Sequence, residues 1–339
     1  MFHIEKNFAL KNHNTMGISA VAENCIRVTS NEQLEAFLKD DLSQSEELLI
    51  LGGGSNVLFL KDKYPIVLLN EIGGIEIQDE NEDAVTLKVG SGVVWHDLVL
   101  FCIERNWGGI ENLSLIPGTV GAAPMQNIGA YGAEVKDVFV SLDALRKKDQ
   151  QWRTFTNEQC QFGYRESVFK NIHKDEFVIA SVTLKLSKNA VVNTSYGAIS
   201  EQLKGNDINE PTIKDVSDAI IAIRQSKLPD PKVIGNAGSF FKNPVIGSDT
   251  FAHLQDQNPD MPSYPQSDGK VKVPAGWLIE RAGWKGKRVG NIGVHNKQAL
   301  VLVNHDNGTG LEIKALSAQI QSSIKEHFGI DLHTEVNFV

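Results

Sequence analysis

The order of apolar and polar residues predicts helices and strands along the whole chain. Apolar residues recur at helical spacing in several segments, and one of these segments follows an N-cap at Ser30. Short apolar runs bounded by glycine or polar residues predict buried strands. We expect helices at 30–38, 94–103, 212–224, 275–282 and 311–328, and strands at 48–51, 57–60, 66–69, 85–89, 139–145, 177–186, 299–303 and 332–338.

A boundary between domains is expected shortly after residue 224. Thr212 and Asp215 have the spacing of a capping box and begin a helix that should end near Arg224. Pro229 and Pro231 then remove two amide donors and hold the chain extended. The last domain should therefore start in this proline-containing stretch.

The most unusual stretch is 116–132, a run of small residues, amides and two prolines. The chain carries no charge from Asn112 to Ala133, although 22% of all residues are charged. Its prolines and glycines exclude the helix of about 20 apolar residues that a bilayer requires. We expect a long, ordered, covered loop whose glycine amides bind the phosphates of a cofactor. A tightly packed crossing between two sheets explains the composition equally well.

Composition narrows the class of protein. The chain has 339 residues, 33 basic and 42 acidic, with a net charge of −9, which argues against a general nucleic-acid binder. Its length favours two or three domains. The three cysteines form neither a disulfide framework nor a zinc motif, so we expect no metal. With no leader and no long apolar segment, the sequence predicts a cytoplasmic protein that does not enter a membrane.

Further candidates stand out by residue type. Glycines 52–54 lie between two apolar runs and offer a second set of amides for a phosphate, although three glycines in a row are more often just a tight turn. His96 is expected at the boundary of a helix. Arg165 lies in a polar, aromatic turn, where it either binds an anion or is solvated. Ser239 follows a glycine but lacks the second glycine of a hydrolase elbow.

Several motifs together resemble the UDP-N-acetylenolpyruvoylglucosamine reductase family, and the resemblance covers nearly the full chain. The motifs are Gly52–Asn56, Ile116–Gly132, Gly163–Ser167, Tyr196–Gly197, Lys227–Pro231, Gly238–Pro244, Lys297–Leu300 and Glu335–Val336.

The resemblance implies an α+β fold: a two-lobed FAD-binding unit of the vanillyl-alcohol-oxidase type, followed by a smaller α/β substrate-binding domain. The corresponding ranges are 1–70 and 71–224 for the two FAD-binding lobes and 225–330 for the substrate-binding domain, with a C-terminal strand at 331–339 that returns Glu335 to the active site. A monomer is expected. Tyr196 identifies the subtype with a tyrosine loop over the substrate.

The resemblance also implies the cofactor. Many relatives in the wider flavin superfamily carry a histidine in the first glycine turn that bonds to the flavin, whereas this chain has Ser55, so FAD should be non-covalent. The implied FAD-binding residues are Gly52, Gly53, Gly54, Ser55, Asn56, Ile116, Pro117, Gly118, Val120, Gly121, Gln126, Asn127, Gly129 and Ala130.

The implied reaction reduces the enolpyruvyl ether of a UDP-linked amino sugar to the lactyl ether, with NADPH first reducing FAD. This reaction belongs to peptidoglycan synthesis, and hence to cell-wall biogenesis, cell shape and cell division. Hydride addition to the vinyl carbon places negative charge next to a carboxylate, and positioned donors stabilise such charge. Arg165 and Glu335 match the family's residues for that task, with the pKa of Glu335 expected to be raised. Ser239 matches the proton donor, and either Lys242 or Lys227 could assist it.

The substrate itself is expected to contact four residues, namely Tyr196, Lys227, Asn243 and Gln298. Two other functions remain open at this stage. An FAD oxidase for another alcohol or sugar would keep the glycine loops without the catalytic set. A nucleotide-sugar binding protein would have lost the flavin.

Overall fold

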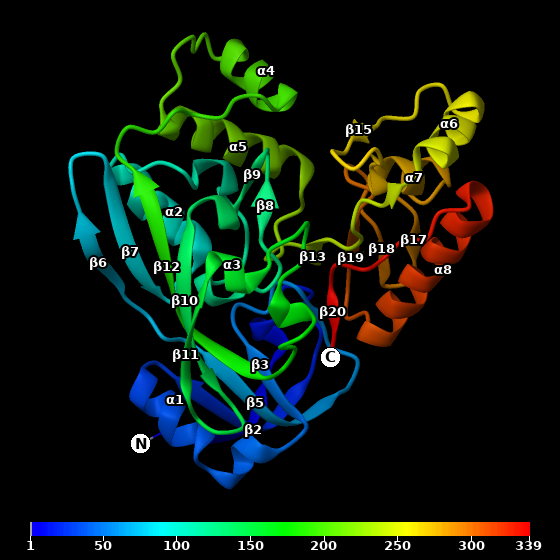
Figure 1. Ribbon diagram of the computed structural model, residues 1–339. Helices are drawn as coiled ribbons and strands as arrows, with labels where there is room; N and C mark the ends of the chain where they lie inside the picture. The colour runs from blue at the N-terminus through cyan, green and yellow to red at the C-terminus, as the bar shows by residue number, and fades with distance from the viewer. Residues whose placement is uncertain (1) are drawn as a thin grey trace. The chain divides into compact units, whose positions relative to one another are not determined.

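The computed structural model describes residues 2–339, which fold into two compact units (Figure 1). The first unit contains residues up to 8, 21–54 and 63–226, and the second contains 9–20, 55–62 and 227–339. The second unit therefore includes two short segments from the N-terminal part of the chain. The contiguous domain ranges expected from the sequence did not place residues 9–20 and 55–62 in the second unit. The functions assigned to those ranges stay predictions.

The first sheet of the first unit has the strand order β1-β2-β5-β3, with β2 and β3 both parallel to β5. Helix α1 begins at the expected N-cap, where the Ser30 side chain accepts from the Gln33 amide. Its buried face packs against this sheet through Leu34, Phe37 and Leu38. The elements are β1 (His3–Ala9), β2 (Val21–Val28), α1 (Asn31–Leu38), β3 (Leu48–Leu51) and β5 (Lys63–Asn70).

The second sheet of the first unit is antiparallel, in the order β11-β10-β12-β7-β6. Strand β12 is almost wholly buried, and helix α2 packs its apolar face, including Trp95, into the same core. The elements are β6 (Ile75–Glu80), β7 (Ala84–Gly90), α2 (Trp95–Glu104), β10 (Phe139–Arg146), β11 (Trp152–Thr156), α3 (Asn157–Cys160) and β12 (Phe177–Ser187).

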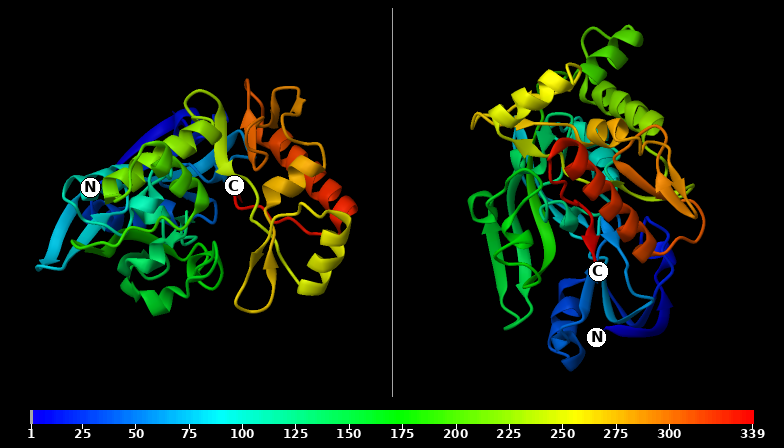
Figure 2. Two further views of the ribbon diagram at one scale, coloured as in Figure 1. Left: turned by 90° about the horizontal axis from the view of Figure 1, so that it is seen from above. Right: turned by 90° about the vertical axis from the view of Figure 1, so that its right-hand side faces the viewer.

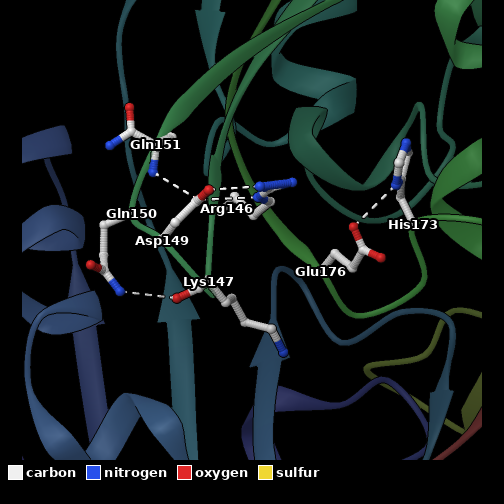
Figure 3. Close-up of polar contacts among 7 residues, drawn as sticks. All are labelled: Arg146, Lys147, Asp149, Gln150, Gln151, His173 and Glu176. Carbon is white, nitrogen blue, oxygen red and sulfur yellow. Dashed lines mark hydrogen bonds and ion pairs between the residues drawn. The ribbon is translucent and has the colours of Figure 1, made fainter.

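The turn that joins β10 to β11 is held by side chains from its own residues (Figure 3). The guanidinium of Arg146 donates two hydrogen bonds to the carboxylate of Asp149, at 3.0 and 2.6 Å. These contacts lower the pKa of Asp149. Nearby, His173 and Glu176 form a pair at 3.1 Å. This end of the sheet is fixed by local contacts.

Two helices and a small hairpin complete the first unit. Helix α5 starts at the expected capping box, since the Thr212 amide donates to Asp215 at 2.8 Å. Together with α4 it buries a separate apolar cluster to which Tyr131 also belongs. The elements are the hairpin strands β8 (Gly129–Ala130) and β9 (Ala133–Glu134), with α4 (Gly197–Gly205) and α5 (Ile213–Lys227).

The second unit is built on an antiparallel sheet in the order β13-β19-β18-β17, with helices α7 and α8 side by side (Figures 1 and 2). Helix α8 has a capping box between Thr309 and Glu312 and ends at Gly329, whose φ is 68°. The elements are β13 (Gly235–Ser239), α7 (Ala275–Arg281), β17 (Arg288–Val289), β18 (Ile292–Val294), β19 (Val301–Asn304) and α8 (Gly310–Phe328).

Shorter pieces finish the second unit. A small antiparallel sheet has the order β14-β16-β15, and β20 lies parallel to β4. The 55–62 segment thus pairs with the end of the chain. The elements are β4 (Val57–Leu58), β14 (Val245–Ile246), α6 (Ser248–Gln257), β15 (Tyr264–Pro265), β16 (Val271–Lys272) and β20 (Asn337–Phe338).

Most of the predicted elements are present, several with different bounds: the strand expected at 57–60 is only Val57–Leu58, and the one expected at 299–303 is Val301–Asn304. Helix α5 continues to Lys227 and does not end near Arg224. Pro229 restricts Leu228 directly, so the residues before Leu228 are free to stay helical. The strand expected over 332–338 is regular only at β20, because Thr334 makes a single bridge with Phe241 and the chain between is irregular.

Candidate active site

The two glycine-rich segments of the first unit lie against each other. A Cβ atom on Gly52 would be 2.4 Å from Oγ1 of Thr119, and one on Gly53 would be 3.1 Å from Cα of Gly118. Glycine at residue 52 is therefore required by the close approach of the Thr119 side chain. The structure brings these two predicted phosphate-binding segments together at one place.

The first half of 116–132 is anchored by its own backbone to the start of α2. Gly118 accepts from the amide of Trp95 at 3.0 Å, while the amides of Val120 and Gly121 donate to Val93 and Ser91, both at 2.9 Å. A short 3₁₀ helix at Val120–Ala122 follows. Ile116 is half-buried and Pro117 exposed. The segment is an ordered loop, as expected.

His96 holds the residue just before this segment. Its Nδ1 accepts a hydrogen bond from the amide of Leu115 at 3.0 Å. Leu115 has a φ of 58°, which an L-residue rarely adopts. Burial lowers the pKa of His96, so the ring is neutral and its proton is on Nε2. The expected boundary histidine thus has a structural task.

The second half of 116–132 is ordered by Asn127, whose side chain is fully buried. Its Nδ2 donates to Glu134 at 3.1 Å and to the carbonyl of Gly163 at 3.0 Å, and its Oδ1 accepts from the amide of Lys136 at 3.1 Å. This amide is engaged in holding the loop. Any cofactor contact by Asn127 is therefore expected through its main chain. Gln126 next to it is half-buried.

Arg165 lies in a half-buried turn directly beside the same loop. Its guanidinium donates to the carbonyl of Gly129, the first residue of β8. Ser167 donates to the carbonyl of Met125 at 2.7 Å. Arg165 has a φ of 57°, a conformation that tertiary contacts must impose. Arg165 is half-buried and held by this hydrogen bond, and the binding of an anion by its guanidinium stays a prediction. Its neighbours Gly129 and Ala130 form the strand β8.

Tyr196 lies at the start of α4 with its ring 44% exposed. The ring meets that of Tyr131 edge to face, with centroids 5.2 Å apart. The buried amide of Asn112 joins the two segments, because it donates to the carbonyls of Tyr131 and Asn193, both at 3.0 Å. Sequence reasoning missed Tyr131 and Asn112, since nothing local marks either residue.

In the second unit, Ser239 and Glu335 lie on neighbouring segments. The amide of Glu335 donates to the carbonyl of Phe240 at 2.9 Å, and its own carbonyl accepts from Asn56 Nδ2 at 3.2 Å. Asn56 also accepts from the amide of Asn337 at 3.1 Å. Ser239 is exposed and Glu335 half-buried. Asn56 thus fixes the end of the chain, while Ser55 accepts at its carbonyl from Thr15 at 3.4 Å.

Asn243 and Gln298 lie at the first turn of α7. Oδ1 of Asn243 accepts from the amide of Ala275 at 2.9 Å, so a hydrogen bond from this side chain to a ligand would come from Nδ2. Oε1 of Gln298 would be 3.2 Å from a Cβ on Gly276. Lys227, the last residue of α5, is exposed, and Lys242 is half-buried.

The cysteine and carboxylate side chains of the described residues form no metal site and no reactive thiol. Cys25, Cys102 and Cys160 are free and buried, and burial raises their pKa values to about 11, about 12 and about 12. Within residues 2–339, no group of three or more histidine, cysteine, aspartate or glutamate side chains is arranged to hold a metal ion. No helix in that range is long and apolar enough to cross a bilayer.

Two family models match separate parts of the chain. Residues 22–154 match an FAD binding domain, and residues 230–339 match the UDP-N-acetylenolpyruvoylglucosamine reductase, C-terminal domain. The first match contains both glycine-rich segments. The second contains Ser239, Asn243, Gln298 and Glu335. The expected FAD cofactor agrees with the first match.

Curated relatives match over the whole length. The chain is 53% identical over 337 residues to the UDP-N-acetylenolpyruvoylglucosamine reductase of Flavobacterium johnsoniae, covering 99% of each. It is 45% identical over 338 residues to that of Pseudomonas aeruginosa, covering 98% of each. The solved reductase structure from Thermus caldophilus has a TM-score of 0.68 at 22% identity, over 100% of this chain and 99% of that one.

Proposed function

The chain belongs to the UDP-N-acetylenolpyruvoylglucosamine reductase family, and we propose that it reduces UDP-N-acetylglucosamine enolpyruvate to UDP-N-acetylmuramate with NADPH. It would do so as a cytoplasmic monomer in peptidoglycan synthesis. The observation that carries the proposal is the full-length identity to the Flavobacterium johnsoniae reductase. The motifs of both units lie inside that match.

We propose that the two glycine-rich segments hold FAD without a covalent bond. Gly52, Gly53 and Gly118 have no side chains of their own over their amides, and the two segments meet at these residues, which suits a diphosphate. Bound FAD supplies a redox centre that accepts a hydride from NADPH and passes it to the substrate. The chain offers Ser55 where covalent relatives have histidine.

Arg165 is proposed to stabilise the negative charge that develops beside the substrate carboxylate. Its planar guanidinium suits a carboxylate, and its hydrogen bond to the carbonyl of Gly129 holds it in place. A donor that is already in position needs little reorganisation when charge develops. Glu335 is proposed to assist as a protonated hydrogen-bond donor.

Ser239 is proposed to deliver the proton that completes the reaction. It directly follows Gly238, which has a φ of 69°, and lies on an exposed strand end. A hydroxyl is a weak acid and needs nearby positive charge, which Lys242 or Lys227 would supply. Tyr196, Lys227, Asn243 and Gln298 are proposed to bind the nucleotide-sugar, with the lysine as a point charge for phosphate. This assigns residues 225–330 to substrate binding and 331–339 to the return of Glu335.

The test is a spectrum followed by a turnover assay. Purified protein should be yellow, should bleach with NADPH, and should regain its colour only when the enolpyruvyl nucleotide-sugar is added. Product should appear in proportion to NADPH consumed. A colourless protein that binds the nucleotide-sugar, or a flavin that reacts with alcohols and oxygen but not with this substrate, would refute the proposal.

A further inference from the structure

Arg224 is a half-buried cation that none of the expected roles uses. It lies near the end of α5, and its side chain is half-buried. Its Nε is fully buried and has no hydrogen-bond acceptor among residues 2–339. An arginine cannot shed its proton, and a buried donor without an acceptor is costly. Among residues 2–339 this atom has no acceptor, so a water molecule or a ligand would have to supply one.

The surroundings of Arg224 lack a compensating negative charge. Burial lowers its pKa, and the interaction that opposes this effect comes from the hydroxyl of Tyr131. No carboxylate contributes among the residues that the structure describes. Buried arginines are normally paired with an anion. The missing partner is thus expected to be anionic.

Two neutral side chains near Arg224, those of Tyr131 and His96, also carry hydrogen-bond donors. The Tyr131 hydroxyl contacts the guanidinium, and the charge of Arg224 also reaches His96. Because Nδ1 of His96 already accepts from Leu115, its Nε2 carries a proton. Arg224, Tyr131 and His96 together present donors, and the one carboxylate whose charge acts on His96 is that of its neighbour Asp97. This set suits an anion and repels a cation.

Tyr131 has a backbone conformation that its residue type does not favour. Tyr131 and Gly132 form the two-residue turn between β8 and β9, with φ values of 50° and 80°. Positive φ at both positions is typical of a type I′ turn, which favours asparagine or glycine over tyrosine. The strain at Tyr131 is balanced by its contacts with Asn112 and Tyr196.

The site lies at the glycine-rich segment. Leu115 immediately precedes residues 116–132, and Tyr131 is close to their end, so the donors around Arg224 hold both ends of the segment. Glycine amides and an arginine are a combination that recognises phosphate oxygens. A diphosphate, with its multiple charges, would satisfy both groups at once.

We propose that Arg224, supported by Tyr131 and His96, binds a phosphate group of a diphosphate ligand. The proposal rests on the proposed function, in which FAD and the nucleotide-sugar both carry a diphosphate. Arg224 bonds a phosphate oxygen, Tyr131 orients the guanidinium, and His96 keeps the entrance of the glycine-rich segment in place.

The experiment compares Arg224→Gln, Arg224→Lys and a control, Arg153→Gln, which removes the same charge from an exposed residue of β11. Apoprotein of each variant is titrated with FAD by flavin fluorescence, and each holoprotein is titrated with UDP by calorimetry. Thermal unfolding of the apoproteins verifies folding.

We expect Arg224→Gln to weaken one of the two affinities by at least about tenfold, as loss of a charged hydrogen bond does. Arg224→Lys should restore part of it, and Arg153→Gln should match the wild type. A loss confined to FAD identifies the cofactor diphosphate, and a loss confined to UDP identifies that of the substrate.

Unchanged affinity for both ligands in a folded Arg224→Gln variant would overturn the proposal. The proposal would also be overturned if a folded Arg224→Gln variant lost no more affinity for FAD and UDP than the Arg153→Gln control loses. A wild-type protein that binds neither FAD nor UDP would instead refute the proposed function. The two failures are therefore distinguishable. Tyr131→Phe, which removes only the hydroxyl that contacts the guanidinium, should weaken the same ligand by a smaller factor.

Discussion

The amide nitrogen of Glu335 lies 2.9 Å from the carbonyl oxygen of Phe240 and donates a hydrogen bond to it. Phe240 directly follows Ser239, so this bond places the proposed proton donor and the proposed protonated carboxyl on adjacent segments. The two residues are almost a hundred positions apart in sequence. Backbone pairing, which depends little on side-chain identity, fixes the separation of two groups that would act on the same substrate.

The first prediction concerns the attachment of FAD. Ser55 cannot form the bond to the flavin ring that a histidine forms, and the three cysteines are buried with raised pKa values, so none is a reactive thiolate. Precipitation with acid should release all of the yellow colour into the supernatant, as measured by absorbance. Colour that remains in the washed pellet would show a covalent bond.

A second prediction tests the contact between the two glycine-rich segments. Gly52→Ala should destabilise the protein by about 1–3 kcal/mol through overpacking and weaken FAD binding, because its Cβ would lie 2.4 Å from Oγ1 of Thr119. Adding Thr119→Ala should recover much of the loss, since it removes that oxygen. Urea unfolding of the singles and the double gives the coupling energy.

Gly73→Ala is the matched control, because a Cβ at residue 73 would meet nothing within 4 Å. It should change stability little. If Gly52→Ala and Gly73→Ala behaved alike, the two segments would not be in contact as described.

Local signals in the sequence predicted the starts of α1 and α5. Ser30, Thr212 and the apolar faces behind them act over a few residues, so α1 and α5 could be predicted without tertiary information. The exchange of segments 9–20 and 55–62 could not, because β4 joins β20 through main-chain bonds that carry no sequence signature.

The same reasoning explains which parts of the site were missed. Glycine runs and motif residues are visible in sequence, whereas Arg224 looked like the last residue of an ordinary helix. Arg224 matters because its Nε is buried without a hydrogen-bond acceptor, and the burial of an atom is known only from the tertiary structure. Tyr131 was likewise part of a predicted loop, but its positive φ and its contacts appear only in the fold.

A third prediction is a pH dependence of stability due to His96. Burial lowers its pKa in the folded state below the value of about 6.5 in an unfolded chain, so protonation favours unfolding. This contribution is complete above pH 6.5 or so and is lost as the pH falls through the lower, folded pKa. The free energy of unfolding should therefore decrease between about pH 7.5 and 5.5.

His96→Asn keeps an acceptor for the amide of Leu115 but cannot be protonated. Its unfolding free energy should fall less steeply over the same range, whereas exposed His3→Asn should follow the wild type. Parallel curves for His96→Asn and the wild type would show that another group titrates.

A fourth prediction concerns Tyr196. Tyr196→Phe keeps the ring against Tyr131 and loses only the phenolic hydrogen bond, worth about 0.5–1.5 kcal/mol, so KM should rise about 2- to 12-fold with FAD content unchanged. Tyr196→Leu, which also loses the ring contact, should have the larger effect. Steady-state kinetics and the ratio of flavin to protein absorbance measure both. An unchanged KM in both variants would exclude substrate binding by this residue.

The last prediction separates the two half-reactions and depends on Ser239 being the proton donor. In the proposed reaction NADPH reduces the flavin before the enolpyruvyl group takes part, so Ser239→Ala should leave flavin reduction near the wild-type rate. Reoxidation by the substrate with product release should slow by roughly 10² to 10⁴, the usual contribution of a positioned acid. Stopped-flow absorbance of the flavin follows each half-reaction by itself. Ser322→Ala, an exposed serine on α8, is the control for loss of a hydroxyl. A defect in reduction by NADPH, or wild-type product formation by Ser239→Ala, would mean that the proton comes from another group, with Glu335 as the nearest candidate along the backbone pairing at Phe240.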